Sequence, residues 1–354
     1  MVAESSWPRD DVTMVSPTEP ASSARPSRGV QPLQCKPWLL NGLSAHLIES
    51  HYENNYGGAV RRLAAINDRL CSIDPAALVP FVLSGLKRDE LAARNSAALH
   101  ELYFASLAFE QASPDEVLGA ALEASFGSFG RWRSEFMAMA NALAGGSGWV
   151  VLSWMRDTGE LVNHLASDHS QALVGATPIL TIDMYEHAYH LDFGANASSY
   201  VDVFMRNVDW NTISARYSAA LDGRAIELRN EREFPEVPCM QPEQVQAMVD
   251  GGEPLQLVDV RPREYVSRTG DRIAAATWYD PERLEEWITT LDRSTPVVAY
   301  CAYGHHVGAL VTQALNDEGY DVSFMLGGHS AWRALGGETV EHHASGSDAA
   351  VWEP

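Results

Sequence analysis

Positive charge is scarce in this chain. Its 25 Lys and Arg residues face 47 Asp and Glu residues, which gives a formal net charge of −22. Phosphate backbones and anionic membrane surfaces are bound mainly through Lys and Arg. The balance therefore argues against nucleic acid or a membrane as a partner and favours small molecules or other proteins.

Closely spaced cysteines and long apolar runs are also missing. The four cysteines, at positions 35, 71, 239 and 301, show no short spacing, which argues against a zinc cluster or a disulfide framework. No run of about 18 apolar residues is available to cross a bilayer, and the N-terminus lacks the basic and apolar regions of a secretory signal. We therefore expect a soluble protein of the reducing cytoplasm.

Large apolar side chains are rare in residues 1–34, which are rich in Ser, Pro, Thr and Ala. Such a segment buries too little surface to offset its chain entropy, so we expect a disordered tail. Residues 221–239 are charged and contain Pro, and we interpret them as a linker, with residues 341–354 as a second tail. The length of 354 residues predicts two domains between these segments.

The first domain begins with a helical pattern. Ser44 is a candidate cap for a helix through residue 70, and residues 87–111 are a second amphipathic stretch, so residues 35–112 are predicted to form a helical hairpin. Residues 113–220 are predicted to be an α+β half with a small antiparallel sheet. Its helices are expected after a capping box at 113–116 and over 130–143, and its strands over 149–154, 161–167 and 178–184.

The second domain, residues 240–340, alternates helical and apolar strand patterns. This alternation is typical of an α/β fold with a parallel sheet. Helices are expected over 242–250, 281–291 and 307–318, and strands over 255–260, 297–300 and 322–326.

One segment at the end of an apolar strand points to a metal. Residues 183–189 read Asp-Met-Tyr-Glu-His-Ala-Tyr, although an isolated Asp and His at such a place are usually structural. Three other segments add weight: His-Tyr at 51–52, Ala-Ser-Phe-Gly-Ser-Phe at 124–129 and Gly-Ser-Gly-Trp at 146–149. With these motifs in this order, residues 38–220 resemble the iron/manganese superoxide dismutase family.

The resemblance implies one iron or manganese ion per chain, with superoxide as the substrate. Its ligands would be His51, His100, Asp183 and His187. Three imidazoles and one carboxylate leave an open position on a redox metal, whereas zinc would bind these ligands without cycling electrons. The implied products are oxygen and hydrogen peroxide.

The surroundings of this implied site depart from the family pattern. Neither usual position for an outer Gln carries Gln, and His169 stands where some members have a His that orients the bound solvent. Asn55 and Ala59 replace the His and Tyr of the family's substrate gateway, and His190 replaces a Tyr. Tyr56 and His190 are candidates for another proton path, because both residue types donate hydrogen bonds.

Glu186 matches a family Glu that contacts the last histidine ligand of the opposite subunit. The resemblance therefore implies a homodimer with its two sites near a shared interface. Because the net negative charge repels superoxide at long range, any steering has to come from local cations such as Arg61, Arg62 and Arg206.

A second candidate site is Cys301, which follows an apolar strand and opens a six-residue loop before a helix. Loop N–H groups and the positive end of the helix stabilise a thiolate there. A lone Cys after a strand is more often a small buried residue. However, Leu-Val-Asp-Val-Arg at 257–261 and Gly-Gly-His-Ser-Ala-Trp at 327–332 flank it, and residues 240–340 resemble a rhodanese-like sulfurtransferase domain.

That resemblance implies that Cys301 accepts sulfane sulfur from a small donor as a persulfide. The rest of its loop would be formed by Tyr303, Gly304, His305 and His306. The family often ends this loop with an Arg that binds thiosulfate, so His306 leaves the donor open. A rhodanese-like fold used only for binding is the alternative.

Two functions are thus compatible with the sequence. The first is superoxide dismutation with a fused sulfurtransferase domain, and the complete set of four ligands favours it. The second is a sulfurtransferase or persulfide-handling protein whose dismutase-like part is a metal-binding dimerisation scaffold with little turnover. The residues at positions 55, 59 and 190 favour the second.

Overall fold

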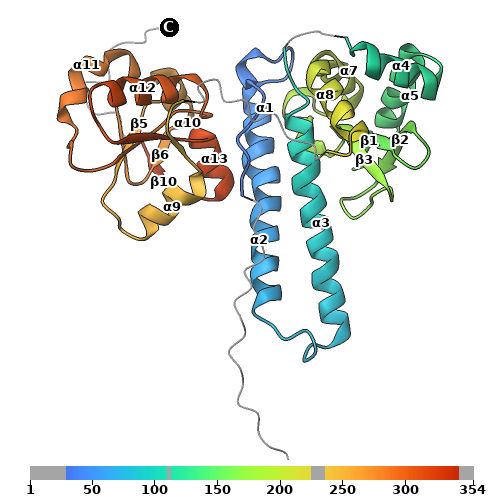
Figure 1. The fold of residues 1–354 in the computed structure, drawn as a ribbon, viewed down its shortest axis with the longest axis horizontal. Helices are drawn as coiled ribbons and strands as arrows, with labels where there is room; N and C mark the ends of the chain where they lie inside the picture. The colour runs from blue at the N-terminus through green and yellow to red at the C-terminus, as the bar shows by residue number, and fades with distance from the viewer. Residues whose placement is uncertain (1–28, 110–112, 225–235, 343–354) are drawn as a thin grey trace, which may run out of the picture.

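The chain folds into the two expected units, and the first of them contains a long helical hairpin (Figure 1). The computed structural model describes residues 29–109, 113–224 and 236–342. The fold class agrees with the prediction: a helical hairpin and a small antiparallel sheet come first, and a parallel α/β unit follows. In Figure 1 the hairpin stands between the small sheet and the α/β unit.

The hairpin is built from two long helical segments. The first is continuous from Ala45 to Cys71, and Ser44 caps it as predicted, since its Oγ accepts a hydrogen bond from Leu47 N at 3.0 Å. The second begins at Pro80 rather than near residue 87, because Pro suits the first position of a helix. The elements are η1 (Pro37–Leu39), α1 (Ala45–Ser50), the π-helical η2 (His51–Tyr56), α2 (Gly57–Cys71) and α3 (Pro80–Phe104).

The α+β half follows. Its three strands form an antiparallel sheet in the order β2-β1-β3. The helix expected after residue 113 is capped by Asp115, whose side chain accepts a hydrogen bond from Leu118 N at 2.8 Å. The elements are α4 (Glu116–Phe126), α5 (Phe129–Ala142), β1 (Trp149–Met155), β2 (Glu160–Ala166), β3 (Ala176–Asp183), η3 (Glu186–Ala188), α6 (His190–Phe193), α7 (Ala197–Arg206) and α8 (Trp210–Leu221).

The second unit has a five-stranded parallel sheet in the order β4-β9-β8-β5-β7 and a separate antiparallel pair, β6 and β10. The helix expected over 281–291 is instead three short consecutive pieces, and the last of them is a 3₁₀ turn over the β-branched run from Ile288 to Thr290, which lowers helix propensity. The strands are β4 (Cys239–Met240), β5 (Gln256–Asp259), β6 (Asp271–Ile273), β7 (Ala276–Trp278), β8 (Val297–Tyr300), β9 (Val322–Met325) and β10 (Thr339–Glu341). The helices are α9 (Pro242–Asp250), α10 (Arg263–Thr269), η4 (Pro281–Arg283), α11 (Leu284–Trp287), η5 (Ile288–Thr290), α12 (His306–Asp317) and α13 (Gly328–Leu335).

Part of the expected N-terminal tail is folded. Val30 and Leu33 are buried, and Gln31 exchanges hydrogen bonds with two tyrosines, donating to Tyr56 Oη at 2.7 Å and accepting from Tyr52 Oη at 2.6 Å. Two apolar side chains are enough to hold this short segment in place. The prediction of a tail is therefore wrong for residues 29–34, and residues 1–28, 225–235 and 343–354 lie outside the described part of the chain.

The two units pack directly on each other. Helix α13 lies against η2 and α2, and Ala331 and Ala334 of α13 belong to the same apolar core as Tyr52. Arg61 on α2 donates a hydrogen bond to the carbonyl of Ala334. Across the described residues, no helix is long and apolar enough to cross a membrane.

Candidate metal centre and cysteine loop

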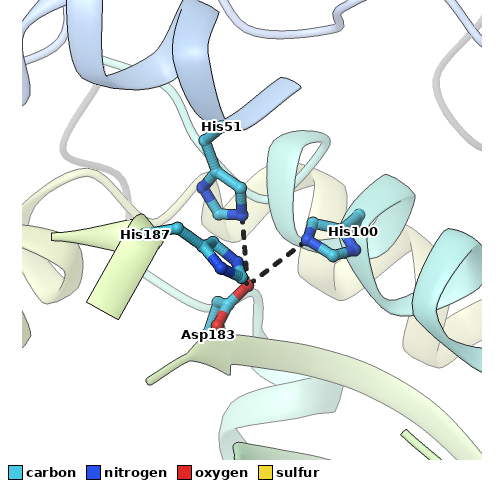
Figure 2. A group of neighbouring side chains, drawn as sticks. All are labelled: His51, His100, Asp183 and His187. Carbon is cyan, nitrogen blue, oxygen red and sulfur yellow. Dashed lines mark hydrogen bonds and ion pairs between the residues drawn. The ribbon is translucent and has the colours of Figure 1, made fainter. Parts of the chain in front are cut away.

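The four predicted ligands meet at one point (Figure 2). His51 comes from η2, His100 from α3, Asp183 from the end of β3 and His187 from η3. Their Nε2 atoms lie 3.1, 3.5 and 3.2 Å from Asp183 Oδ2, in the order His51, His100 and His187. Three separate elements and the turn after β3 thus aim one ligand atom each at a common centre.

The spacing of these atoms fits a metal ion. Atoms bound about 2.1 Å from one ion lie roughly 3 to 3.5 Å apart, which is the spacing found around Asp183. His100 Nε2 is buried and has no hydrogen-bond partner in the described structure. An unpaired buried nitrogen is costly unless a ligand satisfies it. The residues present therefore fit an ion bound by the histidine Nε2 atoms and the carboxylate.

Hydrogen bonds fix the state of the ligands. His100 Nδ1 lies 2.7 Å from the carbonyl of Ser96, so it carries the proton and leaves the Nε2 lone pair for a metal. Burial lowers the pKa of His100 to about 3, and burial also lowers the pKa of His51. Burial alone would raise the pKa of Asp183, but hydrogen bonds from His187 and His51 hold it below its usual range. The site therefore offers the neutral imidazoles of His51 and His100 and the carboxylate of Asp183.

One of the four side chains at the centre is partly exposed. The side chains of His51, His100 and Asp183 are at most 1% exposed, whereas the His187 side chain is 25% exposed. Tyr185 stacks on His187 with ring centroids 5.4 Å apart. Among the four ligands, His187 is therefore the one nearest to solvent.

His169 lies next to the centre, where the sequence predicts a solvent-orienting residue. Its ring stacks on that of His100 at 6.1 Å, and its Nδ1 lies 3.0 Å from the hydroxyl of Tyr185. Its Nε2 is buried without a hydrogen-bond partner among the described residues. Burial lowers the pKa of His169, which favours the neutral ring. Sequence reasoning did not identify Tyr185 as the residue that orients it.

The other predicted outer residues are Tyr56, Glu186 and His190, and they differ in burial. Tyr56 is buried, its ring is 6.4 Å from His100, and its hydroxyl donates to Glu101 at 3.0 Å. Glu186 and His190 are exposed in the single chain. Sequence reasoning missed Glu101, a buried carboxylate that follows directly on a ligand.

The cysteine loop lies at the carboxyl end of β8, as predicted. Cys301 is buried, and α13 holds its loop through two backbone hydrogen bonds, from His329 N to the Cys301 carbonyl at 2.8 Å and from Ser330 N to the Ala302 carbonyl at 3.0 Å. The first turn of α12 faces the sulfur, since a Cβ on Gly308 would lie 3.4 Å from Cys301 Sγ. Gly304 has a φ of 71° and sits against the backbone of Gly327, where a side chain would not fit.

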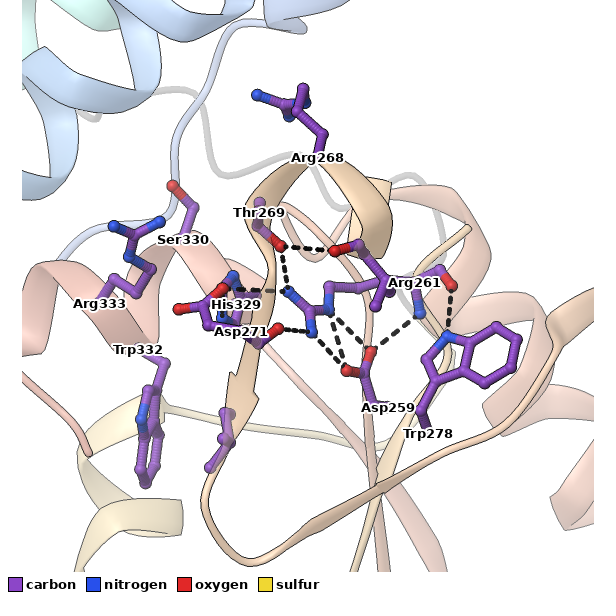
Figure 3. Close-up of polar contacts among 12 residues, drawn as sticks. Asp259, Arg261, Arg268, Thr269, Asp271, Trp278, His329, Ser330, Trp332 and Arg333 are labelled. Carbon is purple, nitrogen blue, oxygen red and sulfur yellow. Dashed lines mark hydrogen bonds and ion pairs between the residues drawn. The ribbon is translucent and has the colours of Figure 1, made fainter. Parts of the chain in front are cut away.

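A buried ion pair fixes the strand beside this loop (Figure 3). Arg261 Nη2 lies 2.6 Å from Asp259 Oδ2, both side chains are fully buried, and the same nitrogen donates to the Asp271 carbonyl at 2.6 Å. Trp278 Nε1 donates to the Arg261 carbonyl at 3.0 Å. The Asp-Val-Arg motif at 259–261 therefore stabilises the fold next to the loop. The sequence did not predict this role.

Comparison with known proteins agrees with this geometry. Residues 114–216 match the C-terminal domain of iron/manganese superoxide dismutases, and residues 241–335 match the rhodanese-like domain. A superoxide dismutase [Fe] of Cupriavidus metallidurans is 54% identical over 192 residues, which cover 54% of this chain and 97% of that protein. The chain therefore belongs to the iron/manganese superoxide dismutase family, and it carries a rhodanese-like domain behind the family's fold.

More distant relatives cover the same part. A superoxide dismutase [Fe] of Aquifex aeolicus is 32% identical over 52% of this chain and 89% of that protein. A superoxide dismutase [Mn] 2 of Haloferax volcanii is 30% identical over 52% of this chain and 94% of that protein. These relatives include both iron and manganese enzymes by name, and the cofactor of this chain is accordingly one iron or manganese ion.

Proposed function

We propose that this protein dismutates superoxide at a mononuclear iron or manganese site. The observation that carries the proposal is the convergence of His51, His100 and His187 on Asp183, in a centre where His187 alone among the four is partly exposed. When bound, the metal supplies reversible one-electron chemistry, by which one superoxide becomes oxygen and a second, with two protons, becomes hydrogen peroxide.

The residues of the chain bind the metal and handle the protons. The four ligands hold the ion, and His169, oriented by Tyr185, is placed to hold a proton beside the centre through its unpaired Nε2. Tyr56, whose hydroxyl donates to Glu101, lies with its ring 6.4 Å from that of His100 and is the second candidate for a proton path. The exposed Glu186 and His190 are available to a second copy of the chain, which supports the proposed homodimer.

The test combines metal content with superoxide decay. His187→Ala should lose most of the bound iron or manganese and reduce the rate of superoxide decay to that of the buffer. His46→Ala is the matched control, because His46 is an exposed histidine on α1 outside the site, and it should leave both quantities unchanged. About one metal per wild-type chain with negligible turnover would contradict the dismutase proposal.

For the second unit we propose sulfur transfer through a persulfide on Cys301. Its loop, residues 301–306, opens at the N-terminus of a 12-residue helix, where backbone N–H groups and the helix dipole stabilise an anionic sulfur. Tyr303, Gly304, His305 and His306 complete the loop. Mass spectrometry after exposure to a sulfane donor should show one added sulfur on Cys301. Uptake by Cys301→Ser equal to that of Cys71→Ser, a control at an exposed thiol, would reject this nucleophile.

A second candidate function rests on one observation. Ala59 is buried and has no polar group where the family places its gateway Tyr, so the dismutase-like part is alternatively a metal-binding dimerisation scaffold with little superoxide turnover. The metal and decay measurements above separate the two candidates.

The domain boundaries and the cellular compartment are also proposals. We assign residues 35–112 and 113–220 to the two halves of the dismutase-like unit and residues 240–340 to the rhodanese-like unit. No disulfide joins the cysteines of the described residues, which supports a reducing cytoplasm.

A further inference from the structure

The cysteine loop is covered by the dismutase-like unit. The ring of Trp38, from η1, stacks on Tyr303 with centroids 5.4 Å apart and meets His305 edge-on at 5.9 Å. The hydroxyl of Tyr303 donates to the carboxylate of Glu49 on α1. The surroundings of Cys301 are thus built in part by residues of the other unit.

Glu49 also binds a cation, Arg268. Arg268 donates from Nη1 to Glu49 Oε2 at 2.6 Å and from Nη2 to Glu49 Oε1 at 2.7 Å, which is a bidentate ion pair. Its guanidinium therefore shares one carboxylate with the Tyr303 hydroxyl, two residues beyond Cys301. The Arg268 side chain is 43% exposed, so a donor molecule can reach it, whereas the Glu49 side chain is only 9% exposed.

A second carboxylate of the same helical segment repeats this pattern. Glu53 on η2 accepts from Ser330 Oγ at 2.8 Å and pairs with Arg333 Nε at 3.2 Å. The buried Arg261 is already paired with Asp259. Each of these three guanidinium groups near the loop therefore faces a carboxylate, and the positive charge that would attract a dianion is neutralised.

We infer that the docked dismutase-like unit selects the sulfur donor, because Glu49 neutralises Arg268 beside the Cys301 loop. The inference rests on the proposed persulfide chemistry. The donor class it assigns is a thiol-borne persulfide with an uncharged carrier, and the class it excludes is the thiosulfate dianion. In the transfer, the Cys301 thiolate attacks the outer sulfur of the donor and forms a new S–S bond. The old S–S bond breaks, and its electron pair leaves with the carrier as a thiolate.

The experiment measures the initial rate of persulfide formation on Cys301 in the full-length protein at pH 8 by mass spectrometry. The two probes are 2-mercaptoethanol persulfide, whose carrier is uncharged, and thiosulfate. Wild type should use the first and scarcely use the second. Glu49→Gln keeps the shape and a hydrogen-bond acceptor for Tyr303, and should raise the thiosulfate rate about tenfold, because one charge acts over a few ångströms at a partly exposed site. It should leave the rate with 2-mercaptoethanol persulfide unchanged.

Two further variants separate a local effect from a general one. Glu49→Gln combined with Arg268→Gln should return the thiosulfate rate to that of wild type. Glu53→Gln makes the same change in net charge one helical turn away and should leave the ratio of the two rates unchanged. Metal content, measured in every variant, reports whether the fold around His51 is intact.

The results that overturn the inference are distinct from those that overturn the proposed function. Equal rates with both donors in wild type, or equal effects of Glu49→Gln and Glu53→Gln on the rate ratio, reject donor selection by Glu49 while sulfur transfer stands. Absence of a persulfide on Cys301 with either donor in wild type rejects the sulfur chemistry itself.

Discussion

The backbone carbonyl of Ser96 determines which nitrogen of His100 faces the metal centre. The sequence predicts His100 as a ligand through its position in the family pattern. The other three proposed ligands were predicted in the same way. It does not predict the tautomer, because that depends on which carbonyl the folded α3 brings to Nδ1. The same limit applies to Glu101, since a lone Glu after a ligand carries no pattern that distinguishes a buried carboxylate from a solvated one.

At the scale of single residues, His169 provides a test of the outer site. His169→Ala should keep the metal, because His169 is not a ligand, but should shift the midpoint potential of the metal and slow superoxide decay by about tenfold to a hundredfold. Potentiometry and stopped-flow decay measure the two effects. His164→Ala, at a half-buried histidine on β2, is the control and should change neither. An unchanged potential in His169→Ala would remove His169 from the site.

Glu53 predicts a dependence of stability on pH. Burial raises the pKa of Glu53 from 4.5 to about 7 in the folded protein. The folded chain therefore keeps a proton that the unfolded chain releases between these values, so this group stabilises the fold at low pH, and that contribution is lost as the pH rises through about 7.

The variant Glu53→Gln should remove this dependence. Between about pH 4.5 and pH 7, the free energy of unfolding of wild type should fall relative to the variant by on the order of 2 kcal/mol, allowing for the partner Arg333. Chemical denaturation at a series of pH values measures the difference. Parallel curves for the two proteins would show that Glu53 titrates normally.

At the scale of elements, η2 is the clearest departure from the predicted secondary structure. The amphipathic pattern predicts one α-helix from residue 45 to residue 70, and the helix is continuous, but residues 51–56 wind as a π-helix. Such a local change in winding depends on packing from both sides, here the metal centre and α13, and leaves no mark on the hydrophobic pattern. The π-helix begins at His51, one of the four proposed ligands.

Elements with strong end signals were predicted best. Helix α9 and strand β8 have the predicted bounds, since Pro242 begins the first and a fully buried apolar run defines the second. Helices α6 to α8 were not predicted, although Asn196 and Asp209 cap the last two of them. Their positions depend on long-range packing, of α7 on α5 and of α8 on α4 and β3, which a local pattern does not contain.

Two adjacent glycines test how closely the units are docked. A Cβ on Gly57 would overlap the backbone carbonyl of Ala334, whereas a Cβ on Gly58 would meet its nearest atom, on Arg61, only at 4.0 Å. Gly57→Ala should therefore destabilise the protein by about 1 to 3 kcal/mol and increase amide exchange in α13. Gly58→Ala should stabilise it by about 0.5 to 1 kcal/mol, because Ala favours the helix. Similar effects of the two variants would mean that α13 does not press on α2.

At the scale of the whole molecule, the net charge of −22 opposes the approach of superoxide. Of the local cations considered for steering, Arg61 is bound to the Ala334 carbonyl, while Arg62 lies close enough to His169 to affect its pKa. Raising the ionic strength from about 0.01 to about 0.15 M shortens the screening length from roughly 30 to 8 Å and should increase the second-order rate constant for superoxide. A rate constant that falls with added salt would instead assign control to local cations such as Arg62.

The segment around Val30 has a consequence for the order in which the protein assembles. Val30 N donates to Glu243 of the second unit at 2.7 Å, while Gln31 is bound by Tyr52 and Tyr56 beside the metal centre. During synthesis these first residues emerge more than 200 positions before their partner on α9. The dismutase-like unit can therefore fold early. However, its N-terminal segment makes its contact with α9 only after the rhodanese-like unit has emerged. The structure is therefore completed late, by a long-range contact.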